Sequence, residues 1–98
     1  MFAAVSMYRM KPGHFDEMQA IAIRGPNLVK TAKGCLSATY YTNKEREEYG
    51  STTIWETRED YEAFRNAIPD ETMERLTSWS REPYVLHTYH DVFVSLDR

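Results

Sequence analysis

The chain has 98 residues, with 12 Lys or Arg and 15 Asp or Glu, giving a net charge of −3. This length predicts a single domain, residues 1–98, and the absence of a basic block argues against a nucleic-acid or membrane partner. Cys35 is the single cysteine, so no intrachain disulfide can form. With no basic segment ahead of an apolar run at the N-terminus and no apolar run long enough to span a bilayer, we expect a cytoplasmic protein.

The first half of the chain predicts a strand, an interrupted helix and a second strand. Residues 2–10 contain no breaker and read as a strand. Apolar residues then recur at three- and four-residue steps from Phe15, which is typical of a helix. Residues 25–26, Gly-Pro, must kink or restart this helix because proline cannot donate to the carbonyl four residues back, and Gly34 ends it. Residues 35–42, rich in aromatic and β-branched side chains, predict the second strand.

The second half predicts a hairpin partner, another interrupted helix and a last strand. Residues 43–50 read as a long, charged loop, and residues 51–57 as the third strand. Thr57 is expected to cap the next helix. Pro69 should divide that helix into two pieces. Residues 82–94 read as a long final strand.

This β-α-β-β-α-β order predicts a ferredoxin-like α+β fold, with two helical segments on one face of a four-stranded antiparallel sheet. The last strand places Tyr84 and Leu86 on one face and Val85 and Tyr89 on the other. Helices can cover only one of these apolar faces. We therefore expect a homodimer that packs sheet to sheet.

Aromatic residues with polar tips cluster at the corner between the third strand and the following helix. An indole N–H, two phenols and a guanidinium around an apolar slot would suit a flat phenolic or enolic ligand and stabilise negative charge on its oxygen. The alternative is that Trp55 and Tyr61 simply pack the core and Arg75 is a solvated charge. The residues concerned are Tyr40, Ser51, Thr53, Trp55, Tyr61 and Arg75.

Metal and cofactor signatures are absent from the sequence. His87 and His90 are three residues apart, a spacing that points them to opposite faces of a strand, so they cannot share one ion. There is no Gly-x-Ser-x-Gly elbow, no phosphate-binding glycine-rich loop and no flavin or nucleotide fingerprint. We therefore expect no metal and no classical bound cofactor.

Two stretches, KGCLSATYY and IWETREDYEAF, together with the strand–helix order, resemble the antibiotic biosynthesis monooxygenase family over about residues 2–93. The resemblance implies a small dimeric α+β barrel. Residues 34–75 are similar to the family's anthrone-oxidising members, which convert a tricyclic aromatic polyketide to a quinone with O₂ and without metal or flavin. Haem-degrading members carry an asparagine in the first strand and a tryptophan near the position of Phe64. This chain has neither, so we do not expect haem.

The resemblance implies specific site residues. Tyr40, Trp55, Tyr61 and Arg75 fall on the polar positions of the anthrone-oxidising pocket, whereas Ser51 replaces its asparagine. Trp55 would donate to a ligand oxygen or to a peroxide, Arg75 would stabilise the substrate anion, and the two tyrosines would orient the ligand and carry protons.

Two further residues complete the expected substrate-binding set. Phe64 follows Tyr61 on the helix and is counted with the pocket, and His87 is the better candidate base, provided that it faces the slot. The expected function is cofactor-independent oxidation of a polycyclic phenol, anthrone or hydroquinone to a quinone, with O₂ as co-substrate. The alternatives are a quinol monooxygenase acting on small quinols, a non-catalytic aromatic-ligand-binding dimer, and a structural dimer whose slot is filled by its own aromatic side chains.

Overall fold

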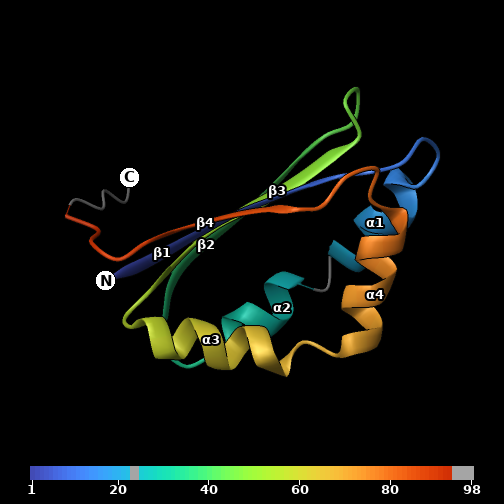
Figure 1. The fold of residues 1–98 in the computed structure, drawn as a ribbon. Helices are drawn as coiled ribbons and strands as arrows, with labels where there is room; N and C mark the ends of the chain where they lie inside the picture. The colour runs from blue at the N-terminus through green and yellow to red at the C-terminus, as the bar shows by residue number, and fades with distance from the viewer. Residues whose placement is uncertain (23–24, 94–98) are drawn as a thin grey trace.

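The computed structural model describes residues 1–22 and 25–93, in which four helices lie against one face of a four-stranded sheet (Figure 1). None of these helices is long and apolar enough to cross a membrane. The elements in chain order are β1 (Phe2–Arg9), α1 (Phe15–Ala22), α2 (Gly25–Lys30), β2 (Cys35–Asn43), β3 (Glu48–Trp55), α3 (Arg58–Ala67), α4 (Asp70–Trp79) and β4 (Val85–Tyr89).

The strand order is β2-β3-β1-β4, and every neighbouring pair is antiparallel. This is the ferredoxin-like arrangement, and it confirms the fold class predicted from the sequence. One row of the register crosses all four strands: Ser6 on β1 pairs with Ser51 and with Leu86, and Ser51 pairs with Tyr40. Because paired residues point to the same face, these four side chains share the helix-covered side of the sheet.

The two faces of the sheet differ in burial. On the helix-covered face, Phe2, Tyr8 and Trp55 are all less than 10% exposed. On the opposite face, Tyr41 is 43% and Tyr89 53% exposed. The described helices thus cover one face only, as the sequence predicted.

Local sequence explains where the helices begin and end. The hydroxyl of Thr57 accepts a hydrogen bond from the backbone N–H of Asp60 at 3.1 Å, which confirms the expected cap of α3. Pro69 separates α3 from α4. The first helical segment is described as α1 up to Ala22 and as α2 from Gly25, the glycine of the predicted Gly-Pro break, and residues 23–24 lie outside the described residues. The prediction that Gly34 ends this segment is wrong, because α2 ends at Lys30; Gly34 lies in the turn before β2 with φ +79°, a left-handed conformation that glycine adopts easily.

Two strand boundaries differ from the sequence prediction. The hairpin connection is shorter than expected, because β3 begins at Glu48 rather than at residue 51. Glu48 is buried in the strand because Arg9 and Arg46 both form ion pairs with its carboxylate, which compensates its charge.

The last strand is also shorter than predicted. β4 ends at Tyr89, which pairs with Ala3, close to the end of its only neighbouring strand. Beyond this pair, β1 offers little backbone to continue the ladder. The end of the predicted range, residue 94, lies outside the described residues.

Candidate functional site

A cavity of about 440 Å³, which we call the central cavity, lies between the helix-covered face of the sheet and the helices. Its floor is formed by strand residues and its roof by α3 and α4, together with Met18, Ile21 and Leu28. An open space therefore exists here, which argues against a slot filled by its own aromatic side chains. The polar and aromatic side chains that line it include Ser6, Tyr8, Tyr40, Tyr49, Ser51, Thr53, Tyr61, Phe64, Arg65, Arg75 and Tyr84.

Hydroxyl groups mark the middle of the cavity floor. Ser6 and Ser51 lie opposite each other on β1 and β3, and their side-chain oxygens are 2.8 Å apart. Leu86 and Tyr40 continue the same row to the sheet edges. Ser51, predicted as a pocket residue, therefore lines the cavity, and its hydroxyl is already engaged with a neighbouring serine.

Trp55 does not line the central cavity. It is fully buried, and its indole N–H donates to the Thr53 hydroxyl at 2.8 Å. The rings of Tyr61 and Phe64 pack against it, with centroid distances of 5.9 and 5.2 Å. This corrects the expectation that Trp55 donates directly to a ligand. The hydroxyl to which it donates belongs to Thr53, which does line the cavity.

The cavity tyrosines are held in their neutral form. Burial raises the pKa of Tyr40 to about 12, with a smaller contribution from Cys35. Burial likewise raises the pKa of Tyr8 to about 12, with Tyr84 adding to the shift and Arg65 opposing it. Near neutral pH these phenols are hydrogen-bond donors, and they cannot act as bases.

Tyr61 and Phe64 reach the cavity from α3, as predicted. Burial raises the pKa of Tyr61, and the positive charge of Arg65 counters this effect. Tyr61 also packs against Phe2, with a ring-centroid distance of 5.4 Å. The phenol of Tyr61 is therefore anchored in the core on one side and faces a cation on the other.

The two arginines of the cavity have different partners. Arg75 lies at its edge, and its Nη2 donates to the Glu71 carboxylate at 2.5 Å on the exposed side of α4. Arg65 is half-buried, and its Nη2 donates to the Tyr84 hydroxyl at 2.8 Å. The Tyr84 ring stacks on Tyr8, with a centroid distance of 4.9 Å.

Sequence reasoning missed Arg65 and Tyr84. The available signal was the four-residue spacing from Tyr61 to Arg65, which places both side chains on the same face of the helix. The residue types could not show that Arg75 pairs with Glu71, one turn earlier, while Arg65 points inward.

His87 is on the wrong face of the sheet for the predicted role. It pairs with Val5, whereas the neighbours of Val5, Ala4 and Ser6, line the cavity. Successive strand residues point to opposite faces, so His87 faces away from the central cavity and is exposed. The condition under which His87 was expected to act as a base, that it faces the slot, is therefore not met. Among the described residues, no group of three or more His, Cys, Asp or Glu is placed to hold a metal ion.

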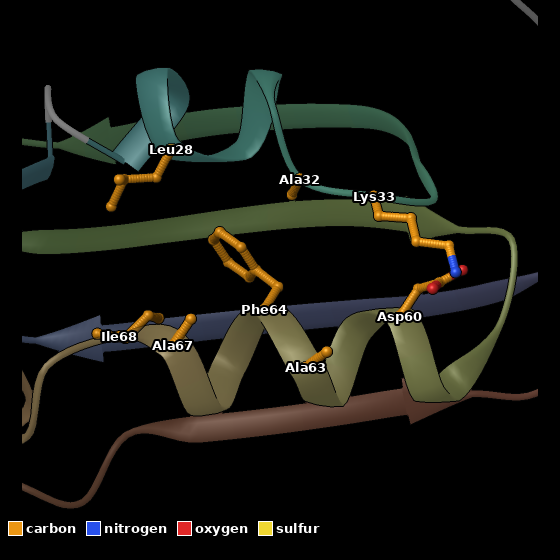
Figure 2. Close-up of a pocket in the computed structure, with 8 residues that line it drawn as sticks. All are labelled: Leu28, Ala32, Lys33, Asp60, Ala63, Phe64, Ala67 and Ile68. Carbon is orange, nitrogen blue, oxygen red and sulfur yellow. The ribbon is translucent and has the colours of Figure 1, made fainter.

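A second hollow, of about 400 Å³, runs between α2 and α3 (Figure 2). Leu28 and Phe64 project into it from the two helices, and both also line the central cavity. Ala67 and Ile68 are shared in the same way. The second hollow and the central cavity are thus neighbouring spaces with a common wall that includes Phe64.

Comparison with solved structures places this fold among known ones. Rv0793 from Mycobacterium tuberculosis is similar with a TM-score of 0.80 and 13% identity, over 99% of this chain and 96% of that one. A conserved protein from Methanosarcina mazei Go1 has a TM-score of 0.81 and 14% identity, over 93% and 92%. A monooxygenase from the gene ActVA-Orf6 of Streptomyces coelicolor, in complex with the ligand nanaomycin D, has a TM-score of 0.71 and 21% identity, over 99% and 92%. At these identities the likeness establishes the fold alone.

Sequence comparison establishes the family. No curated protein gave a significant match. The model of the antibiotic biosynthesis monooxygenase family matches residues 1–69, which contain β1 to α3 and most of the cavity floor. Membership supports a general monooxygenase role. The chain belongs to the antibiotic biosynthesis monooxygenase family.

Proposed function

We propose that this protein is a cofactor-independent monooxygenase that oxidises a polycyclic aromatic phenol, anthrone or hydroquinone to a quinone with O₂. The observation that carries the proposal is the central cavity itself. It combines apolar walls with neutral phenols and a guanidinium, in a chain of a monooxygenase family. A fold neighbour that holds nanaomycin D adds support for a small-molecule ligand in this architecture.

The proposed reaction needs little from the protein beyond binding and electrostatics. An anthrone ionises at the carbon between its rings, and the resulting anion is electron-rich enough to reduce O₂. The carbon loses two hydrogens, one oxygen atom becomes the new carbonyl, and the other leaves as water. The protein must hold the ring, stabilise its oxyanion and supply protons to the peroxide.

The cavity residues fit these tasks. Tyr40 and Tyr61 orient the ring and donate hydrogen bonds, and Phe64 packs against its face. Ser51 contributes a hydroxyl at the position of the family's asparagine. Arg75 stands at the cavity edge, where it would contribute charge only after leaving Glu71.

The test is to mix the pure protein with 1,8-dihydroxyanthrone in air and follow quinone absorbance together with O₂ consumption. We expect turnover above the protein-free rate, equal consumption of O₂ and substrate, no turnover in an anaerobic cuvette, and no effect of a chelator. A rate equal to the protein-free background would contradict the anthrone reaction. Turnover of menadiol in the same assay would then favour a small quinol, and binding without turnover would favour a ligand-binding protein.

We also propose that the protein is a cytoplasmic homodimer joined through the uncovered face of the sheet. Val5, Met7, Ile54 and Val85 alternate with the cavity-facing residues and are only partly covered within one chain. A second copy would bury them together with the exposed Tyr89. Sedimentation of the wild type and of Val85→Lys tests this, because a dimer predicts halving of the mass in the variant. A monomeric wild type at micromolar concentration would contradict it.

A further inference from the structure

Arg65 carries a charge that nothing in the described part of the chain neutralises. None of the ion pairs among residues 1–22 and 25–93 includes it. Its one side-chain hydrogen bond there runs to the hydroxyl of Tyr84, a neutral group. A guanidinium has five N–H donors, so most of its donor capacity is left over.

The lining of the central cavity makes this charge unusual. Among the described residues, no Asp, Glu or His contributes to it. Of its two arginines, Arg75 is paired with Glu71 on the outer side of α4, which leaves Arg65 as the uncompensated cation in this part of the chain. The titratable and charged groups that face the cavity are Tyr8 from β1, Tyr40 from β2, Tyr49 from β3, Tyr61 and Arg65 from α3, Arg75 from α4 and Tyr84 before β4.

A half-buried cation without a counter-charge is costly, and an anionic ligand relieves that cost. The neighbouring phenols cannot take that role themselves. Burial raises the pKa of Tyr8 to about 12 and also raises the pKa of Tyr61, so both phenols stay protonated near neutral pH. An anionic ligand would supply the negative charge that none of the described residues places beside Arg65.

The phenols of Tyr84 and Tyr61 line the central cavity together with Arg65. Tyr84 accepts the Arg65 hydrogen bond, so its own O–H remains to donate. Its ring is fixed by stacking on Tyr8 at an interplanar angle of 16°. Tyr61 lies one helical turn before Arg65 and also lines the cavity. A guanidinium beside phenolic O–H groups is an arrangement that stabilises an oxyanion.

We propose that the central cavity takes its aromatic substrate as the oxyanion of an ionised phenol or enol, held by Arg65 and the Tyr84 hydroxyl, without a general base from the protein. The binding part of this proposal is independent of the reaction, whereas the oxidation of the bound anion rests on the proposed function. The ligand class is an aromatic ring system with an acidic hydroxyl or an enolisable ketone.

The reaction balances without a protein base. The substrate proton goes to solvent as the oxyanion binds. The anion passes one electron to O₂, and the resulting radical and superoxide combine to form the carbon–oxygen bond. The peroxide takes a proton from solvent through the neutral phenols. Loss of the remaining C–H proton and cleavage of the O–O bond then release water and leave the carbonyl.

The test uses 2-hydroxyanthraquinone, whose visible absorbance changes when its phenol ionises and which is already oxidised, so turnover does not complicate the measurement. The dye is titrated from pH 5 to pH 10 with and without a saturating excess of protein. We expect the bound dye to ionise at least one pH unit below the free dye, which corresponds to at least tenfold tighter binding of the anion. Arg65→Gln should abolish the shift and Arg65→Lys should retain part of it. Arg58→Gln, which removes an exposed α3 arginine paired with Glu62 outside the cavity lining, should leave the shift within about twofold of the wild type.

Three results would overturn the proposal: no binding of the dye by the wild type up to millimolar concentration, a bound dye that ionises at or above the pH of the free dye, and a shift lost in Arg75→Gln but kept in Arg65→Gln. Thermal unfolding of each variant identifies any that do not fold. The wild-type titration alone shows whether the bound dye ionises at a lower pH than the free dye. A shifted dye with no oxidation of 1,8-dihydroxyanthrone would support the anion site and refute the proposed reaction. Turnover of 1,8-dihydroxyanthrone without a shift in the ionisation of the bound dye would support the proposed reaction and refute the anion site.

Discussion

The helix-covered face has one region around Trp55, the Trp55 end, and another around Arg65, the Arg65 end. Both contain aromatic residues with polar groups, but the polar groups differ in whether they have partners within the protein. At the Trp55 end the indole N–H is bonded to Thr53, and the ring is enclosed by Tyr61 and Phe64. At the Arg65 end the guanidinium is bonded only to Tyr84 among the described residues, and the space beside it is open.

The difference shows that a polar side-chain group indicates a binding site only when it lacks a hydrogen-bond partner or counter-charge inside the protein. A satisfied indole in a dry core contributes stability. A cation in a cavity without a carboxylate contributes affinity for an anion. Variants at the two ends should therefore separate effects on folding from effects on ligands.

The largest effect is expected from removing the side chain that closes the Trp55 end. Trp55→Ala should lower the free energy of unfolding by about 3–5 kcal/mol, because it deletes a fully buried ring and leaves a cavity. Urea denaturation measures this. Trp55→Phe is the control, since it keeps most of the packing and loses the bond to Thr53, and it should cost clearly less. Equal stability of Trp55→Ala and the wild type would mean that this end is not packed as described.

At the Arg65 end, the larger effect should be on turnover. Arg65→Gln should lower kcat for 1,8-dihydroxyanthrone about 10²–10³-fold, the usual loss when a donor to a developing oxyanion is removed. Arg75→Gln is the matched control on the neighbouring helix. It should cost less than about tenfold, because its charge is already shared with Glu71 in an exposed pair. The reverse order of the two variants would assign the anion to Arg75.

Alkaline pH offers a way to perturb the Arg65 end as a whole. The pKa of Tyr8 is raised to about 12 by burial, above its ordinary value of 10.0, so the folded state keeps a proton that the unfolded state loses. This stabilisation is complete below pH 10 and is lost as the pH rises toward 12, by at most about 3 kcal/mol. Urea denaturation between pH 8 and pH 11.5 should show the decline, and Tyr8→Phe should make it shallower, with the contribution of Tyr40 remaining. A stability that rises with pH in this range would contradict the burial of neutral phenols.

The smallest effect is expected at the glycine beside the Trp55 end. A Cβ on Gly34 would clash with the carboxylate of Asp60, whereas Gly13 has a similar positive φ and nothing within 4 Å of its Cβ position. Gly13→Ala should therefore cost only its backbone strain, about 1–2 kcal/mol, and Gly34→Ala about 1 kcal/mol more. Thermal unfolding of the two variants gives the difference directly. Equal costs would mean that Asp60 moves aside freely.

Much of the fold could be predicted because local signals agree with one another. Proline at residue 69, the Thr57 cap and the alternation around Ser51 each mark an element in the sequence, and their order leaves few topologies. The ends of the strands were harder to predict from the sequence. Glu48 reads as a loop residue until its two arginine partners are known, and the end of β4 depends on how far β1 extends beside it.

Only some of the residues that line the cavity could be predicted from the sequence. Tyr40, Ser51 and Tyr61 reach the cavity as expected, because strand alternation and helix spacing determine their faces. Whether His87 faces the cavity could not be predicted, because its face depends on the pairing register with β1. Arg65 was missed because the choice between two arginines rests on which one has a carboxylate one turn away. The pairing register of a strand and the ion-pair partner of an arginine can be read only from the three-dimensional structure.

The most direct test of the proposed site is a crystal structure of the protein with 2-hydroxyanthraquinone. We predict that the ring lies in the central cavity with its ionised oxygen within hydrogen-bonding distance of Arg65 and Tyr84, while the Trp55 indole stays bonded to Thr53. A ring held by the Trp55 N–H, or bound on the outer face of the sheet with the central cavity empty, would contradict the assignment of this cavity as the active site.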